Sequence, residues 1–71
     1  MKSEELLAMS RAELDAANLD LRAVAREVNV ALTATCLDDR CSHARMAVIP
    51  LASAVRRLAR AEFAARLGRL T

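Results

Sequence analysis

The chain has 71 residues, a net charge of +2 and 55% hydrophobic residues, so it forms at most one small domain whose core supplies little stability. Strong helix formers dominate it, with 16 alanines, 11 leucines and 10 arginines against one glycine, one proline, one phenylalanine and no tryptophan or tyrosine. So few turn residues exclude β-sandwiches and β-barrels, and the composition predicts an all-α fold.

The first predicted element is a helix over residues 3–37. Ser3 can cap it, and Glu4 and Glu5 fall in its first turn, where carboxylates interact favourably with the helix dipole. Large residues then recur every seven positions, and a smaller residue follows each of them by three positions. This large and small seam predicts close packing against an antiparallel second helix. Its members are Leu7, Leu14, Leu21 and Val28, with Ser10, Ala17, Val24 and Ala31.

A second apolar row begins at Met9, two residues after Leu7. Two residues turn a helix by about 200°, so this row faces nearly the opposite way. Because one hairpin covers only one side of its first helix, we expect a second copy to cover the other and to complete a dimeric four-helix bundle. The alternative is an irregular third segment of the same chain. The predicted dimer interface comprises Met9, Ala16, Leu19, Ala23, Val30 and Leu37.

The chain is expected to turn at residues 38–42, where Asp38, Asp39 and Ser42 interrupt the apolar rhythm. A second helix follows over residues 43–68, and Gly68 is expected to end it as a C-cap. Pro50 lies inside this helix, where it removes one hydrogen bond and clashes with the preceding turn. It therefore predicts a kink, or a break with a third helix starting at residue 50. The whole chain is one helical-hairpin domain, residues 1–71.

The stripe predicted to face the first helix comes from the second half of this element. Its residues recur at helical spacing, and we expect them to meet the large and small seam. They are Leu51, Ala54, Val55, Leu58, Ala61 and Ala65.

Charge is divided unevenly along the chain. Residues 1–35 hold four basic and six acidic side chains, a net −2, whereas residues 36–71 hold seven and three, a net +4. One interpretation is that an acidic helix pairs with a basic helix inside the hairpin. The other is that the basic half is a surface for nucleic acid, acidic lipid or an acidic protein.

Arginine and the only aromatic residue share one stripe of the second helix. Arg56, Arg60, Phe63 and Leu67 follow one another at helical spacing, with Arg57 on the same arc. Arginine and aromatic residues are enriched at the energetic centres of protein interfaces, so these five residues are the predicted partner-binding site. The alternative is that the apolar members pack against the first helix.

Cys36, Cys41 and His43 are the only cluster with metal-ligand character. A structural zinc needs four ligands and this group offers three, so no metal site or cofactor is predicted. The two cysteines are expected to be free thiols, and the alternative is a disulfide or redox-sensitive pair. Cys36 is expected to be buried in the last turn of the first helix. His43 has neither a nucleophile elbow nor a glycine-rich cradle nearby, so no catalytic residue and no enzyme activity are predicted.

The location predicted for the protein is the cytoplasm. Acids stand near the N-terminus where a secretory signal needs basic residues, and the longest uncharged stretches, 28–37 and 46–55, are about half as long as a bilayer span. The favoured hypothesis is a homodimeric hairpin that binds and inhibits or regulates a larger protein, without a membrane partner. The alternative is RNA or DNA binding through the arginine-rich face of the second helix.

Overall fold

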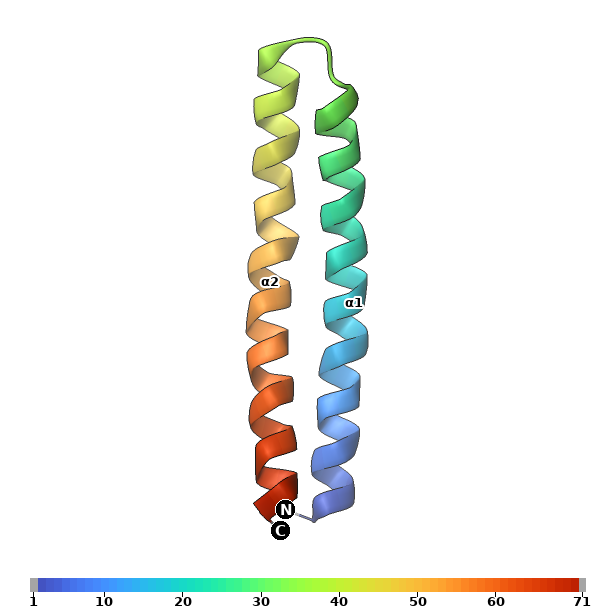
Figure 1. Ribbon diagram of the computed structural model, residues 1–71, viewed down its shortest axis with the longest axis vertical. Helices are drawn as coiled ribbons and strands as arrows, with labels where there is room; N and C mark the ends of the chain where they lie inside the picture. Colours follow the sequence, from blue (N-terminus) through green and yellow to red (C-terminus); the bar gives the residue numbers. More distant parts are fainter. Residues whose placement is uncertain (1, 71) are drawn as a thin grey trace.

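The computed structural model describes residues 2–70 as two antiparallel helices, α1 (Ser3–Thr33) and α2 (Leu37–Leu70), joined by residues 34–36 (Figure 1). Helix α1 begins and α2 ends at the same end of the molecule. The described residues contain no strand, so the expected all-helical hairpin is confirmed.

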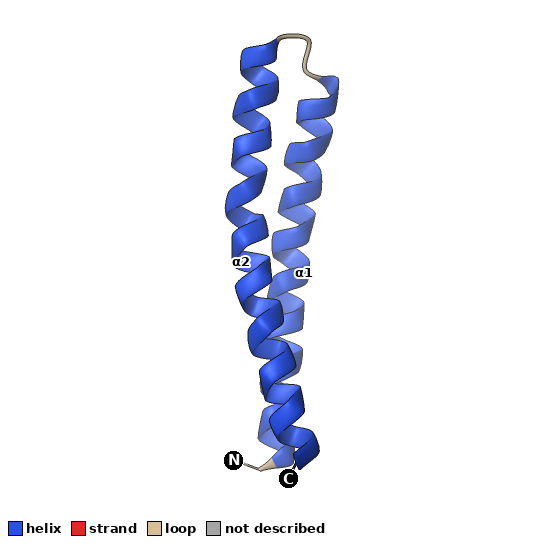
Figure 2. Cartoon of the chain, turned by 60° about the vertical axis from the view of Figure 1, so that its left-hand side comes forward, coloured by secondary structure: helices blue, strands red, loops and turns tan. Residues whose placement is uncertain are grey.

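The hairpin is a rod of 53 × 13 × 11 Å, and the two helices stay side by side along its whole length (Figures 1 and 2). Its radius of gyration is 16.1 Å. A compact chain of this length has a radius of gyration of about 11 Å. The shape therefore leaves most side chains on the surface.

The turn lies earlier than the predicted residues 38–42, because α1 ends at Thr33 and α2 already begins at Leu37. The boundaries predicted at residues 37 and 43 were therefore wrong. Asp38 and Asp39 occupy the first turn of α2, where their charge is favourable next to the helix dipole. The Sγ atom of Cys36 accepts a hydrogen bond from the backbone N–H of Asp39 over 3.4 Å. Residues interpreted as turn formers thus start the second helix.

Helix α2 runs without interruption through Pro50. The alternative of a break with a third helix starting at residue 50 is therefore wrong. Pro50 is half-buried. The loss of one backbone hydrogen bond at a proline is tolerated here because the helix continues for several turns on both sides.

Small residues fill the seam between the two helices. On α2, the row Ala47, Ala54, Ala61 and Gly68 recurs every seven residues, and its three alanines are no more than 7% exposed. A Cβ atom placed on Gly68 would lie 3.7 Å from the Cβ atom of Leu6, so the helices approach closely there. Since α2 continues to Leu70, Gly68 belongs to this seam and is not the C-cap that the sequence predicted.

The buried residues of the hairpin are almost all small. Ser10 lies in the seam on α1, where its hydroxyl donates a hydrogen bond to the carbonyl of Leu7 over 2.9 Å. No large side chain is fully buried among the described residues. The buried set is Leu6, Ser10, Ala17, Ala47, Ala54, Ala61 and Ala64.

The predicted seam of alternating large and small residues is divided by the structure. Its small members face α2, as Ala17 with 1% exposure shows, but Leu7 and Leu14 are 70% and 49% exposed. The stripe predicted on α2 is divided in the same way, because Ala54 and Ala61 are buried whereas Leu51, Val55 and Leu58 are exposed. The expectation that these leucines fill the hairpin seam is therefore wrong, because the close approach of the helices leaves room mainly for small side chains.

A leucine in place of Ala54 tests this close packing. Ala54 is 0% exposed, so Ala54→Leu is expected to push the helices apart and to lower the free energy of unfolding by about 1–3 kcal/mol. Ala52→Leu is the matched control, because Ala52 is exposed on the same helix and leucine has nearly the same helix propensity as alanine. Urea unfolding followed by circular dichroism measures both, and equal stabilities would contradict the seam.

Candidate interaction faces

A row of acidic residues on α1 forms ion pairs with basic residues on α2. Glu13, Asp20 and Glu27 recur every seven residues on α1. The Nε atom of Arg57 lies 3.1 Å from Oδ2 of Asp20, and Nε of Arg60 lies 3.3 Å from Oε2 of Glu13. The acidic first helix therefore pairs with the basic second helix inside the hairpin, as one of the two charge interpretations predicted.

The third acid of this row meets the only histidine. The Nδ1 atom of His43 lies 2.8 Å from Oε2 of Glu27, and both side chains are half-buried. The carboxylate accepts this hydrogen bond, so the imidazole is engaged between the helices. Together with the ion pairs of the arginines, this contact fixes the register between α1 and α2.

The five predicted partner-binding residues have different environments. Arg57 and Arg60 are held by the acids of α1, whereas Arg56 makes no ion pair within the described residues. Phe63 is 65% exposed and Leu67 is half-buried. The alternative interpretation placed Phe63 against α1, but in the single hairpin Phe63 is not buried there.

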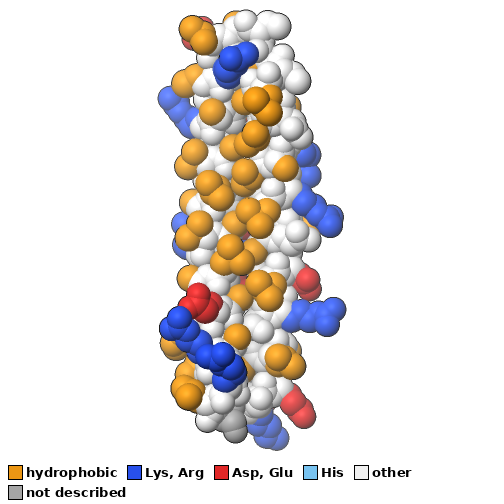
Figure 3. Space-filling model, viewed as in Figure 1, with side chains coloured by type: hydrophobic (Ala, Val, Ile, Leu, Met, Phe, Trp, Pro, Cys, Tyr) orange, Lys and Arg blue, Asp and Glu red, His pale blue; other side chains and the backbone are white. Residues whose placement is uncertain are grey.

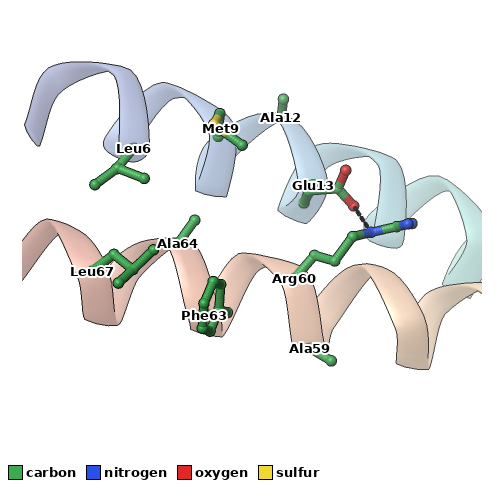
Figure 4. A pocket seen from close by; sticks show the side chains of 9 residues that line it. All are labelled: Leu6, Met9, Ala12, Glu13, Ala59, Arg60, Phe63, Ala64 and Leu67. Atoms are coloured by element: carbon green, nitrogen blue, oxygen red, sulfur yellow. Dashed lines mark hydrogen bonds and ion pairs between the residues drawn. The ribbon is translucent and has the colours of Figure 1, made fainter. Parts of the chain in front are cut away.

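A hollow of about 600 Å³ opens beside Phe63 between the two helices (Figure 4). Apolar side chains line it, and the pair of Glu13 and Arg60 closes one end. The side of the hairpin that carries this hollow is called the Phe63 face. The lining residues are Leu6, Met9, Ala12, Glu13, Ala59, Arg60, Phe63, Ala64 and Leu67.

The predicted dimer interface lies on this same Phe63 face. Met9 lines the hollow, and Ala16, Ala23 and Val30 follow it at intervals of seven residues along α1. Leu19 follows Ala12, another lining residue, by seven positions and is 63% exposed. The structure therefore brings the two predicted sites together on one surface.

Leu37 is the exception among the predicted dimer residues. It starts α2 and is 81% exposed. Because the turn precedes it, Leu37 does not continue the row of Met9 on α1.

A second apolar face, most of whose residues were predicted to fill the hairpin seam, lies on the other side of the rod. Four residues at intervals of seven on each helix flank the seam there, and Val28 and Ala44 line one shallow hollow of about 300 Å³ with Arg40. We call this side the leucine face. It consists of Leu7, Leu14, Leu21 and Val28 on α1 with Ala44, Leu51, Leu58 and Ala65 on α2.

The surface of the rod reflects this arrangement. Figure 3 shows one wide face, on which hydrophobic side chains form a nearly continuous line from one end to the other, while charged side chains stand mainly along the margins. Leu7, Leu14, Leu21 and Val28 are 42–70% exposed. The sequence shows that these four large apolar residues form a row without a charged member. It does not show that the row faces solvent.

The cysteines lie at the turn end of the hairpin. Cys36 and Cys41 are both free and exposed, so the burial expected for Cys36 is wrong, because the first helix ends before it. His43, the third member of the cluster, points to Glu27. Residues 2–70 contain no group of three or more side chains placed to hold a metal ion.

Comparisons with known proteins add no family. No protein-family model, characterised protein or solved structure shows significant similarity to the chain. Neither helix, over the residues described, is long and apolar enough to cross a membrane. The two exposed apolar faces are therefore the candidate functional sites.

Alanine substitutions distinguish the arginines that hold the hairpin together from those available to a partner. Arg57→Ala removes the contact with Asp20 and is expected to lower the free energy of unfolding by about 0.5–1 kcal/mol at low salt, and by less at about 1 M salt. Arg56→Ala, the neighbouring control, is expected to change it by less than about 0.5 kcal/mol. If chemical unfolding gives the same change in the free energy of unfolding for Arg57→Ala as for Arg56→Ala at both salt concentrations, the ion pairs do not stabilise the hairpin.

Proposed function

We propose that the protein is a non-catalytic interaction module, a homodimeric helical hairpin that binds a larger protein and inhibits or regulates it. The observation that supports this proposal is the inverted distribution of its apolar side chains. Seventeen large hydrophobic residues are at least 42% exposed, whereas the buried seam consists mostly of alanine. Contiguous exposed apolar surface of this kind marks sites of protein interaction.

The amount of exposed surface supports the need for a second chain. The hairpin exposes 5492 Å². A compact monomer of 7.7 kDa exposes about 4,300 Å², so the excess is about 1,200 Å². A standard protein interface buries about 800 Å² on each partner. Covering one wide face therefore removes about two thirds of this excess.

The Phe63 face is the surface that we assign to the larger partner. It combines a hollow of about 600 Å³ with the exposed ring of Phe63. About two helical turns before Phe63 lies Arg56, which makes no ion pair among the described residues. An aromatic or aliphatic side chain of the partner that fills such a hollow next to Phe63 gives the buried anchor on which interface affinity depends. Two apolar faces on opposite sides allow a dimer contact and a partner contact at the same time.

Nucleic-acid binding, the alternative function, is less well supported by the charges. Arg57 and Arg60 are neutralised by acids of α1, and Arg66 forms an ion pair with Glu62. Fewer arginines of α2 are therefore available for phosphate groups than the sequence indicated. If the protein nevertheless binds RNA or DNA with an affinity that falls steeply with salt, the alternative is favoured over the proposal.

Two alanine variants test the partner surface. Phe63→Ala and Arg56→Ala are each expected to weaken partner binding by more than about 1 kcal/mol, about fivefold in affinity. Phe63 lines the hollow, and Arg56 lies seven residues before it on the same stripe of α2 and makes no ion pair among the described residues. The partner is first isolated from a lysate of the source cells with the unmodified protein, and affinities are then measured by calorimetry. Arg45→Ala, an exposed arginine outside the hollow on the same helix, is the control.

The helical content and the mass of each variant must equal those of the unmodified protein for this comparison. Unchanged affinity of both variants would place the partner site elsewhere. An equal loss in the Arg45→Ala control would indicate a general charge effect.

A further inference from the structure

The leucine face has the properties of an interface between two copies of the chain. The positions that flank the hairpin seam on this side carry no charged residue, whereas the corresponding row of the Phe63 face contains Arg60 on α2. The register of the hairpin places Leu6 opposite Gly68 and Glu13 opposite Arg60. The same register aligns the leucine face into four layers, which pair Leu7 with Ala65, Leu14 with Leu58, Leu21 with Leu51, and Val28 with Ala44.

These four layers form half of a bundle core. The two central layers hold two leucines each, and the outer layers combine one larger residue with an alanine. Regularly spaced apolar layers of this kind are filled in four-helix bundles by the same layers of a facing helix pair. A second copy presents layers with the same seven-residue spacing as those of this face.

We propose that two copies pair through their leucine faces, with both turns at the same end of the bundle; this inference rests on the homodimer of the proposed function. In this arrangement the two-fold axis is parallel to the rod. Each α1 then packs beside α2 of the partner subunit in the same antiparallel register as beside its own α2. The Phe63 faces point outward on both sides and stay open to the larger partner.

The charges at the margins of the leucine face select this arrangement. Glu4 and Arg11 lie on the row next to Leu7 and Leu14 on α1, and Glu62 and Arg69 lie on the corresponding row of α2. With the turns at the same end, Glu4 stands beside Arg69 of the partner subunit, and Arg11 beside Glu62 of the partner subunit. Each pair occurs twice, so the bundle gains four complementary contacts.

The opposite arrangement, with the turns at different ends, lacks this complementarity. There each α1 packs against α1 of the other copy, so Glu4 stands near Leu32 of the partner subunit, and Glu62 near Val48 of the partner subunit. Such placements give these charges no opposite charge on the partner subunit. Ion pairs at an interface margin contribute more to the choice of arrangement than to affinity, and Glu62 retains its pair with Arg66 in either case.

Disulfide crosslinking distinguishes the two arrangements. In a Cys36→Ser, Cys41→Ser background, Asn18→Cys is made alone and together with Val55→Cys, because both positions are exposed on the marginal rows. With the turns at the same end, residue 18 faces residue 55 of the partner subunit, so only the double variant is expected to give covalent dimers on mild oxidation. Covalent dimers of Asn18→Cys alone would overturn the proposed arrangement, because residue 18 faces its own copy only when the turns lie at different ends.

Glutamate substitutions identify which face pairs. Leu14→Glu is expected to weaken the dimer at least tenfold in sedimentation equilibrium, because it places a charge in a central layer. Leu19→Glu, the matched control on the Phe63 face, is expected to change the dimer affinity by less than about threefold. The reverse pattern would overturn the assignment of the leucine face and support the dimer interface predicted from the sequence.

The outcomes also separate this inference from the proposed function. If the unmodified protein is dimeric but the double cysteine variant gives no covalent dimer, the leucine face is not the interface, while the homodimer remains. A helical monomer at micromolar concentration would contradict the homodimer itself.

Discussion

The close approach of two helices through a row of small residues is the constraint on which the structure depends. Ala47, Ala54, Ala61 and Gly68 present almost no side-chain bulk to α1, so the helices come close together, and Leu6, opposite Gly68, is the one leucine buried between them among the described residues. The large apolar residues are therefore displaced to the two wide faces of the rod. A chain that buries alanines and exposes leucines has little hydrophobic stabilisation of its own, which is why its function is expected to depend on association.

The ion pairs give this slender seam its register. A row of small residues tolerates sliding, because neighbouring alanines offer similar packing at every turn of the helix. The contacts of Glu13, Asp20 and Glu27 with α2 occur at three separate heights and hold the helices in one alignment. The acidic row thus accounts for three of the six acidic residues in the first half of the chain. It also uses two of the arginines that otherwise resemble a binding surface.

The sequence predicted the helical hairpin because alanine and leucine dominate it and turn residues are rare. It misplaced the turn, because Asp38 and Asp39 favour both turns and the first turn of a helix, and in the structure they occupy the first turn of α2, where the Cys36 Sγ accepts the backbone N–H of Asp39. The faces were partly predicted: two apolar sides were recognised, but the leucine row was assigned to the seam. Periodicity shows which residues share a side of a helix, whereas the distance between helices decides which side is inside. That distance depends on Ala54 and Ala61, on the other helix.

On the proposed function, the hairpin is half of a larger core that a second copy completes. The most direct measurement is sedimentation equilibrium of the unmodified protein in reducing buffer at micromolar concentration, with circular dichroism of the same samples. We predict a mass of twice 7.7 kDa, together with a melting temperature that rises with protein concentration. A mass of 7.7 kDa for a fully helical protein, with a melting temperature independent of concentration, would contradict the account.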